Sequence, residues 1–270
     1  MKVTVIQLDI VWGNPMENIK RAENLINKTP DSDLYVLPEM WSTGFATEPF
    51  GIAEEESTSI SLEWMKKLAR EHHCAICGSL AIHVDGIYRN RHYFVDGNKE
   101  TVTYYDKHHL FHYGGEDCHY LPGQHHTLVE YQGFRLLLLT CYDLRFPVWS
   151  RYSDQLKFDA IIVVANWPES RQNAWQILSR ARAIENQAYL IGCNRVGDDD
   201  YSHYRGMSAI ISPIGKTLAC CQPHIEETIT YDLNLELLNH QRTKFTVLED
   251  RDIFRIGIMI NKEYNSKEFR

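Results

Sequence analysis

The chain has 270 residues, of which 44% are hydrophobic and 24% are charged, as in ordinary globular proteins. A chain of this length buries a substantial core without metals or disulfide bonds, so a disordered chain, a collagen-like fibre and a small disulfide scaffold are excluded. The 28 Lys and Arg residues and 36 Asp and Glu residues give a formal net charge of −8, which argues against binding nucleic acid through its phosphates.

The sequence also lacks the patterns of a membrane or secreted protein. Its longest apolar stretches, residues 134–141 and 160–165, are much shorter than the roughly 18 residues that span a bilayer. Gln7 and Asp9 interrupt the apolar residues near the N-terminus, unlike the apolar region of a secretory signal. The seven cysteines are an odd number and are expected to be mostly reduced thiols. We therefore expect a cytoplasmic protein that binds neither membrane nor nucleic acid.

The first part of the chain alternates strand and helix patterns. Residues 3–10 alternate like a strand, and Asn14 and Pro15 then supply an N-cap and a proline at the first helical position. Residues 34–37 form a short apolar run of the buried-strand type, and a second helix begins near Ser61.

Strands and one further helix follow along the rest of the chain. The predicted elements are strands over residues 74–82, 88–95, 100–105, 134–140, 160–165 and 189–193, a helix over 172–186, a hairpin over 207–219 and a last strand over 228–233. About ten strands mixed with about four helices indicate a layered α/β protein. Because no linker, low-complexity segment or repeat divides the sequence, we expect a single domain over residues 1–270.

Three reactive side chains, Glu39, Lys107 and Cys141, each follow a strand-like run. Side chains at the strand ends of α/β sheets gather in one crevice, so these three residues are expected to converge. A thiol becomes a nucleophile with the help of an ammonium group or a general base, which Lys107 and Glu39 would supply. The thiolate would then attack a carbonyl or nitrile carbon. Spacing alone, however, does not separate this triad from unrelated residues that follow strands.

The residues around the triad resemble a known family, the nitrilase superfamily of carbon–nitrogen hydrolases, over nearly the whole chain. The matching segments are Leu37-Pro38-Glu39-Met40, residues 105–111 around Lys107, and residues 141–147 from Cys141 to Pro147. Residues 165–168, 181–189 and 192–197 resemble the omega-amidase branch, which hydrolyses the terminal amide of 2-oxoglutaramate and 2-oxosuccinamate.

The resemblance implies a fold and a role for each residue of the site. The family fold is an α-β-β-α sandwich, and its members commonly dimerise through their outer helices, so we expect a homodimer. Cys141 is implied as nucleophile, Glu39 as general base and Lys107 as oxyanion stabiliser, while Glu116 takes the place of a second glutamate that positions Lys107 and the substrate. Neither a cofactor nor a metal is implied. The partner is a small molecule, the omega-amide of a 2-oxo acid.

Further residues near the triad are expected to contact this substrate. Tyr142 would contribute its backbone N–H to the oxyanion, and Arg145 would either grip a carboxylate or form a structural salt bridge. Asn166 and Trp167 follow a buried strand and would line the pocket, although the Trp also fits a core position. The aromatic side chains Trp41, Phe45 and Phe111 would either wall a small dry pocket or simply pack in the core.

One departure from the omega-amidase branch lies at Met207, which follows His203-Tyr204-Arg205-Gly206 where the branch often has an acidic residue. This difference predicts an altered shape of the substrate pocket.

Alternative functions use the same or other residues. The same triad would also serve a nitrilase, a carbamoylase or a deaminated-glutathione amidase. A non-catalytic metal or redox module would instead use Cys74 and Cys77, which follow His72-His73, or the histidines between His108 and His126. The two cysteines fit an apolar strand, and the histidine spacings match none of the usual metal-binding patterns, so core thiols and a polar loop are the simpler interpretations.

Overall fold

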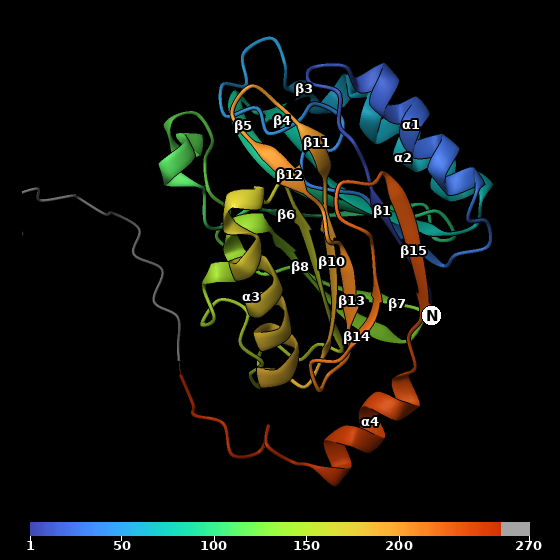
Figure 1. The fold of residues 1–270 in the computed structure, drawn as a ribbon, viewed down its shortest axis with the longest axis vertical. Helices are drawn as coiled ribbons and strands as arrows, with labels where there is room; N and C mark the ends of the chain where they lie inside the picture. The colour runs from blue at the N-terminus through green and yellow to red at the C-terminus, as the bar shows by residue number, and fades with distance from the viewer. Residues whose placement is uncertain (255–270) are drawn as a thin grey trace, which may run out of the picture.

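Two β-sheets pack face to face in the computed structural model, which describes residues 1–254 (Figure 1). The strands of the first sheet are β1 (Lys2–Gln7), β2 (Leu34–Val36), β3 (Glu54–Glu55), β4 (Ala75–Val84), β5 (Ile87–Asp96), β6 (Thr101–Asp106) and β15 (Glu227–Asp232). Their order is β15-β1-β2-β4-β5-β6, and β3 also pairs with β4. Residues 255–270 of the expected domain lie outside the described residues.

The second sheet is formed mainly by the later part of the chain. Its strands are β7 (Leu128–Tyr131), β8 (Phe134–Thr140), β9 (Ala160–Ala165), β10 (Tyr189–Asn194), β13 (Ala209–Ile211) and β14 (Thr217–Cys220). They lie in the order β14-β13-β10-β9-β8-β7, and a separate two-stranded sheet pairs β11 (Val196–Asp198) with β12 (His203–Arg205).

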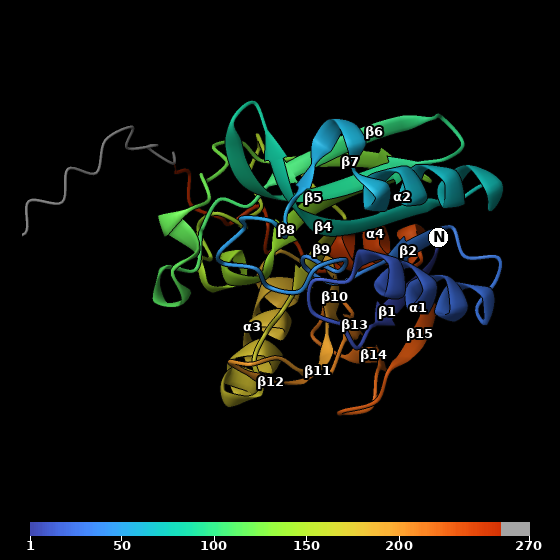
Figure 2. The same cartoon turned by 90° about the horizontal axis from the view of Figure 1, so that it is seen from above.

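Helices cover the outer faces of the two sheets. The helices are α1 (Pro15–Asn27), α2 (Ile60–Glu71), α3 (Gln172–Glu185) and α4 (Leu235–Lys244). In Figures 1 and 2, α3 lies on the opposite side of the strands from the α1–α2 pair. The expected α-β-β-α sandwich is therefore confirmed.

Local sequence signals fix the ends of the first two helices. The Asn14 side chain accepts a hydrogen bond from the N–H of Glu17 at the start of α1, where Pro15 takes the first helical position. Ser59 caps α2 in the same way by accepting from the N–H of Leu62. Each cap satisfies a backbone donor that the helix itself leaves free.

Alternation along the strands divides the core into two parts. Val3 and Val5 of β1 pack between the sheets, whereas Ile6 packs under α1 and α2. Strands β8 and β9 are buried almost throughout, which explains their uninterrupted apolar sequence.

The pairing of the strands brings the expected site residues to one edge. Strand β9 pairs in parallel with both β8 and β10. Cys141 directly follows β8 and Asn166 directly follows β9, so both residues lie at the carboxyl ends of neighbouring parallel strands. This is the place where side chains of an open α/β sheet reach a crevice.

The sequence-based assignment missed several short or polar elements. The elements β3, β7, β11, β12 and α4 were not predicted, and the first strand ends at Gln7 rather than at residue 10. Strand β3 has only two residues, and Leu238 is the single buried residue of α4. Such elements carry too little apolar periodicity to be recognised.

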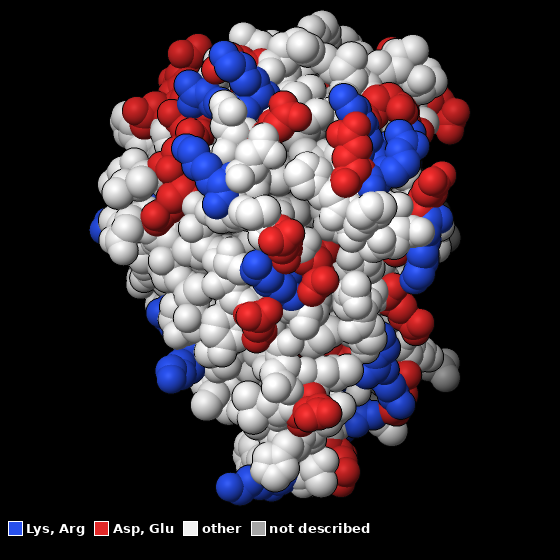
Figure 3. Space-filling view, turned by 90° about the vertical axis from the view of Figure 1, so that its right-hand side faces the viewer, with Lys and Arg blue, Asp and Glu red and all other residues white. Residues whose placement is uncertain are grey.

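The surface in Figure 3 mixes acidic and basic side chains without a large area of one sign. This face therefore offers no extended positive field for a polyanion. Within residues 1–254, no helix has the length and apolar character needed to cross a bilayer.

Candidate active site

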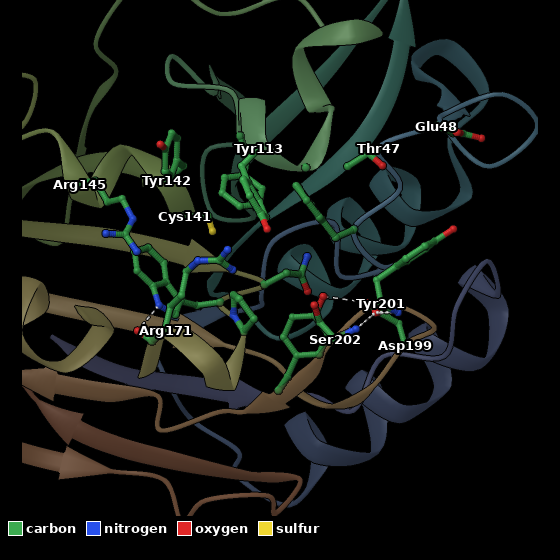
Figure 4. Close-up of a pocket in the computed structure, with 17 residues that line it drawn as sticks. Thr47, Glu48, Tyr113, Cys141, Tyr142, Arg145, Arg171, Asp199, Tyr201 and Ser202 are labelled. Atoms are coloured by element: carbon green, nitrogen blue, oxygen red, sulfur yellow. Dashed lines mark hydrogen bonds between the residues drawn. The ribbon is translucent and has the colours of Figure 1, made fainter. Parts of the chain in front are cut away.

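A cavity of about 460 Å³ opens at the carboxyl ends of β8 and β9, and Cys141 is part of its wall (Figure 4). The sequence-predicted residues that line it are Phe45, Phe111, Cys141, Tyr142, Arg145, Asn166 and Trp167. Glu39, Lys107 and Glu116 lie deeper, with side chains that are fully buried. The structure thus brings together ten residues that lie as much as 128 positions apart in the sequence, from Glu39 to Trp167.

Cys141 lies in a strained turn, where β8 ends and the short 3₁₀ helix η4 (Cys141–Arg145) begins. Its φ angle is +45°, a left-handed conformation that is costly for a residue with a side chain. The residue is 9% exposed, so the chain turns sharply and still leaves the thiol accessible from the cavity.

The fully buried Asp143 holds this turn in place. Its carboxylate accepts hydrogen bonds from the N–H of Thr140 (3.0 Å) and the hydroxyl of Tyr105 (2.8 Å). It also accepts from the backbone N–H of His109 (2.9 Å) and pairs with the imidazole of that residue (2.8 Å). Burial alone would raise the pKa of Asp143, but the hydrogen bonds from His109 lower it below its usual value. An ionised Asp143 therefore ties the Cys141 turn to the segment that carries Lys107.

Behind the cavity, one ammonium group lies between two carboxylates. Lys107 Nζ is 2.8 Å from Glu39 Oε1 and 2.8 Å from Glu116 Oε2. Burial would lower the pKa of Lys107, but Glu116 and Glu39 together raise it above its usual value. Burial and the nearby Glu39 also raise the pKa of Glu116, with Lys107 acting in the opposite direction. Lys107 is therefore a permanent cation, and one of its three N–H groups is not used by the two glutamates.

The thiol of Cys141 is protonated at rest in this setting. Burial and the Glu39 carboxylate raise the pKa of Cys141 well above its usual value, and Lys107 offsets only part of this effect. A base next to the thiol is therefore needed to generate the thiolate.

Asn166 and Trp167 link the cavity wall to the buried cluster. The backbone N–H of Asn166 donates to Glu39 Oε2 at 2.8 Å, and its side-chain amide donates to the carbonyl of Glu39 at 2.7 Å. The guanidinium carbon of Arg145 lies over the indole ring of Trp167, 4.8 Å from the ring centroid. The indole N–H of Trp167 donates to the carbonyl of Arg171. Trp167 is therefore both almost fully buried and part of the cavity wall.

Two expectations about the cavity wall were wrong. Trp41 packs on Trp64, with ring centroids 5.1 Å apart, in the core beneath α2 rather than on the cavity. Met207 is absent from the residues that line the cavity and lies instead beside Trp175, which donates its indole N–H to the Met207 carbonyl. Its difference from the omega-amidase branch therefore does not alter the cavity wall directly.

Sequence reasoning missed several residues of the site. Asn90 of β5 donates to both glutamates, and Arg171 and Tyr113 line the cavity near Cys141 (Figure 4). The loop between β11 and β12 contributes Asp199 and Tyr201. Only the arginine carried a usable signal, because it closely follows the Asn166-Trp167-Pro168 segment.

The two arginines of the wall have no acidic partner among residues 1–254. The Arg171 guanidinium lies over the rings of Phe111 and Tyr113, at 5.5 Å and 5.2 Å, and that of Arg145 lies over Trp167. Neither guanidinium makes an ion pair with any carboxylate of the described chain. The salt bridge considered for Arg145 is therefore not found among these residues.

The histidines and paired cysteines serve other contacts. His108 and His126 stack on Trp149, with ring centroids 3.7 Å and 3.8 Å apart. Cys74 and Cys77 are buried free thiols of the core. Across residues 1–254, no group of three or more His, Cys, Asp or Glu side chains is arranged to hold a metal ion.

Comparison with known proteins gives a consistent result over most of the chain. The carbon-nitrogen hydrolase family model matches residues 2–243. Omega-amidase YafV of Escherichia coli K12 is 40% identical over 257 residues, which are 95% of this chain and 98% of that protein. The 2-oxoglutaramate amidase of Bacillus subtilis is 35% identical over 80% of this chain and 85% of its own length.

A solved structure agrees with the fold described above. XC1258 from Xanthomonas campestris, a CN-hydrolase superfamily protein with an arsenic adduct in its active site, superposes with a TM-score of 0.91. It is 34% identical, and the match covers 95% of this chain and 99% of that one.

Proposed function

Because this chain belongs to the carbon–nitrogen hydrolase family, we propose that it is an omega-amidase that acts on 2-oxo acids. It would hydrolyse the terminal amide of 2-oxoglutaramate, and of 2-oxosuccinamate, to the 2-oxo dicarboxylic acid and ammonia. Sequence similarity supports this substrate, since the chain is 40% identical to an omega-amidase and 35% identical to a 2-oxoglutaramate amidase.

One observation carries the proposal for this chain in particular. Arg145 and Arg171 line the same cavity as Cys141, and neither guanidinium has a carboxylate partner in the described chain. A buried or half-buried guanidinium without a counter-ion is well suited to a carboxylate, which it binds through paired hydrogen bonds. The omega-amide of a 2-oxo acid supplies that carboxylate at one end and the scissile amide at the other.

The first half of the reaction forms a thioester. Glu39 takes the proton of the Cys141 thiol, and the thiolate adds to the amide carbon as the carbonyl electrons move to oxygen. The third N–H of Lys107 and the backbone N–H of Tyr142, in the first turn of η4, stabilise this oxyanion. Glu39 then returns the proton to the leaving nitrogen, the C–N bond breaks and ammonia departs.

The second half repeats these steps with water. Glu39 removes a proton from water, the hydroxide adds to the thioester carbon and the C–S bond breaks to release the carboxylic acid. The proton on Glu39 then returns to the Cys141 sulfur, which restores the resting enzyme. Glu116 positions Lys107 throughout, since its carboxylate accepts from Nζ at 2.8 Å.

The first experiment measures ammonia release from 2-oxoglutaramate by the wild type and by Cys141→Ala, with glutamine, asparagine and a simple nitrile as comparison substrates. We expect turnover of the keto-amide alone, and a loss of at least about a thousandfold in the folded variant because the catalytic groups act as a unit. Wild-type turnover by Cys141→Ala would overturn the mechanism. Turnover of the nitrile instead would favour a nitrilase, and turnover of none would leave a carbamoylase or a deaminated-glutathione amidase to be tested.

We also propose that residues 1–270 form one domain that assembles as a homodimer. Ile177 and Ile184 lie one above the other on the outer face of α3, and they are 56% and 50% exposed. Ile214 is 66% exposed and belongs to the turn that packs beside Ile184. An apolar patch of this kind is typical of a protein interface.

A cytoplasmic location is the compartment that the thiols support. All seven cysteines are free, and six of them are buried or half-buried. Free thiols are typical of proteins kept in a reducing compartment.

A further inference from the structure

Asn90 occupies an unusual place between the two buried glutamates. Its side-chain nitrogen donates to Glu39 Oε1 at 2.8 Å and to Glu116 Oε1 at 2.9 Å. Asn90 is 1% exposed and lies in the middle of β5, and its backbone carbonyl accepts from the N–H of Lys107. Asn90 therefore contacts both carboxylates through its side-chain amide, and the strand end that carries the lysine through its backbone carbonyl.

The chemistry of its neighbours fixes the orientation of this amide. The NH₂ group has two hydrogens, one for each carboxylate. The reversed orientation would place the amide oxygen against two carboxylate oxygens, with no hydrogen between them. Asn90 Oδ1 accordingly points away and has no hydrogen-bond partner in the described structure.

Both carboxylates are surrounded by donors that cannot accept a proton. Glu39 accepts from Lys107, Asn90 and the backbone N–H of Asn166. Glu116 accepts from Lys107, Asn90 and the backbone N–H of Phe111. Three donors on each side favour two ionised carboxylates, since a protonated oxygen would meet an opposing hydrogen, and at Glu116 they oppose the burial that raises its pKa.

The same contacts distinguish the two oxygens of Glu39. Oε1 accepts from both Lys107 and Asn90, whereas Oε2 accepts, among the described residues, only from the N–H of Asn166. A carboxylate oxygen accepts about two hydrogen bonds, so Oε2 is the one with capacity for another proton.

We propose that Asn90 is a positioning residue that keeps Glu39 and Glu116 ionised together and leaves Oε2 of Glu39 as the oxygen that takes the Cys141 proton. The inference rests on the proposed roles of Glu39 and Cys141. It adds a residue on which the protonation of the base depends.

The other titratable groups around the cluster do not replace this function. Within residues 1–254, Lys107 is the only cation in direct contact with the two glutamates. His92, two residues along β5, stays neutral because burial lowers its pKa to about 3. Burial and Glu116 raise the pKa of Tyr120 well above its usual value, and its hydroxyl donates to Ala46. The remaining neighbour, Cys141, is the group that gives up its proton.

Removing the amide donors therefore has a predictable sign. Two carboxylates that share one ammonium group repel each other, so one of them takes up a proton at a higher pH when the Asn90 hydrogens are lost. A proton on Glu39 removes the base, and a proton on Glu116 makes Glu39 less basic, so in either case the acidic limb of the activity profile moves upward.

The test compares Asn90→Asp, which keeps the shape but replaces the two donors by a third carboxyl group, with Asn90→Ser, which keeps one donor and adds no charge. The rate of Cys141 alkylation by iodoacetamide is followed against pH by peptide mass spectrometry, alongside ammonia release. We expect the acidic limb to rise by about one pH unit or more in Asn90→Asp and by less in Asn90→Ser. Asn186→Asp, at another fully buried asparagine outside the cluster, is the matched control and should leave the limb in place.

Two results would overturn the inference. One is that the rate of Cys141 alkylation in the folded Asn90 variants falls at the same acidic pH as in the wild type, and is lowered by the same factor at every pH. The other is an equal shift in Asn186→Asp. If Asn90→Asp does not fold, the shift of the acidic limb in Asn90→Ser alone decides whether the inference holds. Because alkylation needs no substrate, a wild type that releases no ammonia would contradict the proposed function and leave this test intact.

Discussion

At the scale of single residues, the groups proposed for catalysis and those proposed to bind the substrate lie at different depths in the cavity. The charged groups of the proposed reaction, Glu39, Lys107 and Glu116, are fully buried, whereas the two arginines lie on the accessible wall. A buried charge that is held by hydrogen bonds keeps its position because water does not compete with its partners. An accessible guanidinium, held only by aromatic rings, remains free to bind a substrate.

Removing one arginine should therefore weaken binding more than chemistry. We expect Arg171→Ala to raise KM for 2-oxoglutaramate by about 10- to 100-fold, since a hydrogen bond to a charged group contributes about 1.5–3 kcal/mol. The value of kcat should change little, because the carboxylate is bound equally in the ground state and the transition state. Steady-state kinetics on the keto-amide measure both constants.

The control for this variant is Arg180→Ala, an exposed arginine of α3 that is absent from the cavity wall. It should leave KM unchanged. An Arg171→Ala enzyme with the wild-type KM would show that this guanidinium does not bind the substrate. The same conclusion would follow if Arg180→Ala raised KM by the same factor as Arg171→Ala.

At the scale of elements, the position of Lys107 depends on how a later loop crosses the end of β6. A Cβ atom at Gly123 would lie 2.1 Å from the carbonyl oxygen of Asp106, the last residue of that strand. The N–H of Gly123 also donates to the carbonyl of Lys107 at 2.9 Å. A side chain here would push the strand end, and Lys107 with it, away from Glu39.

Gly97 provides a matched comparison at the opposite end of β6. A Cβ atom there would lie 2.0 Å from the carbonyl oxygen of Ala69 in α2, far along the strand from Lys107. We expect Gly97→Ala and Gly123→Ala each to lower the free energy of unfolding by about 1–3 kcal/mol through overpacking. Only Gly123→Ala should also lower kcat, measured at a temperature where both variants are folded. Equal activity in the two variants would contradict this role of the crossing.

The elements also show which parts of the structure the sequence could predict. The cap at Asn14 and the proline after it predicted the start of α1, and the apolar runs predicted β8 and β9. These signals are local, because each depends on neighbouring residues only. By contrast, α4 buries only Leu238 and has no apolar face that a sequence pattern would reveal.

The site divides in the same way. Glu39, Lys107 and Cys141 follow recognisable strands, so their convergence could be expected from the fold class. Asn90 lies within a strand, 51 residues from Glu39 and 26 from Glu116, and its role depends on three segments meeting. Contacts of this kind follow from tertiary packing and leave no mark in the local pattern.

At the scale of the whole molecule, α3 has one face that packs on the sheet and another that is exposed. Trp175, Ser179 and Ala183 are buried on its inner side, whereas Ile177 and Ile184 are half exposed on its outer side. An exposed apolar face on a helix that also begins beside the cavity at Arg171 would connect assembly to the site.

The double variant Ile177→Asp/Ile184→Asp tests this assembly. We expect the wild type to have the mass of a dimer and the variant that of a single chain, because two carboxylates facing each other across an apolar interface would be buried without partners. Light scattering coupled to size-exclusion chromatography gives the mass directly.

Ile225→Asp, at an isoleucine that is also 50% exposed, is the control and should remain dimeric. A dimeric double variant would place the interface elsewhere. A monomer that keeps its kcat would show that each chain holds a complete site, and one that loses kcat would show that assembly supports the site.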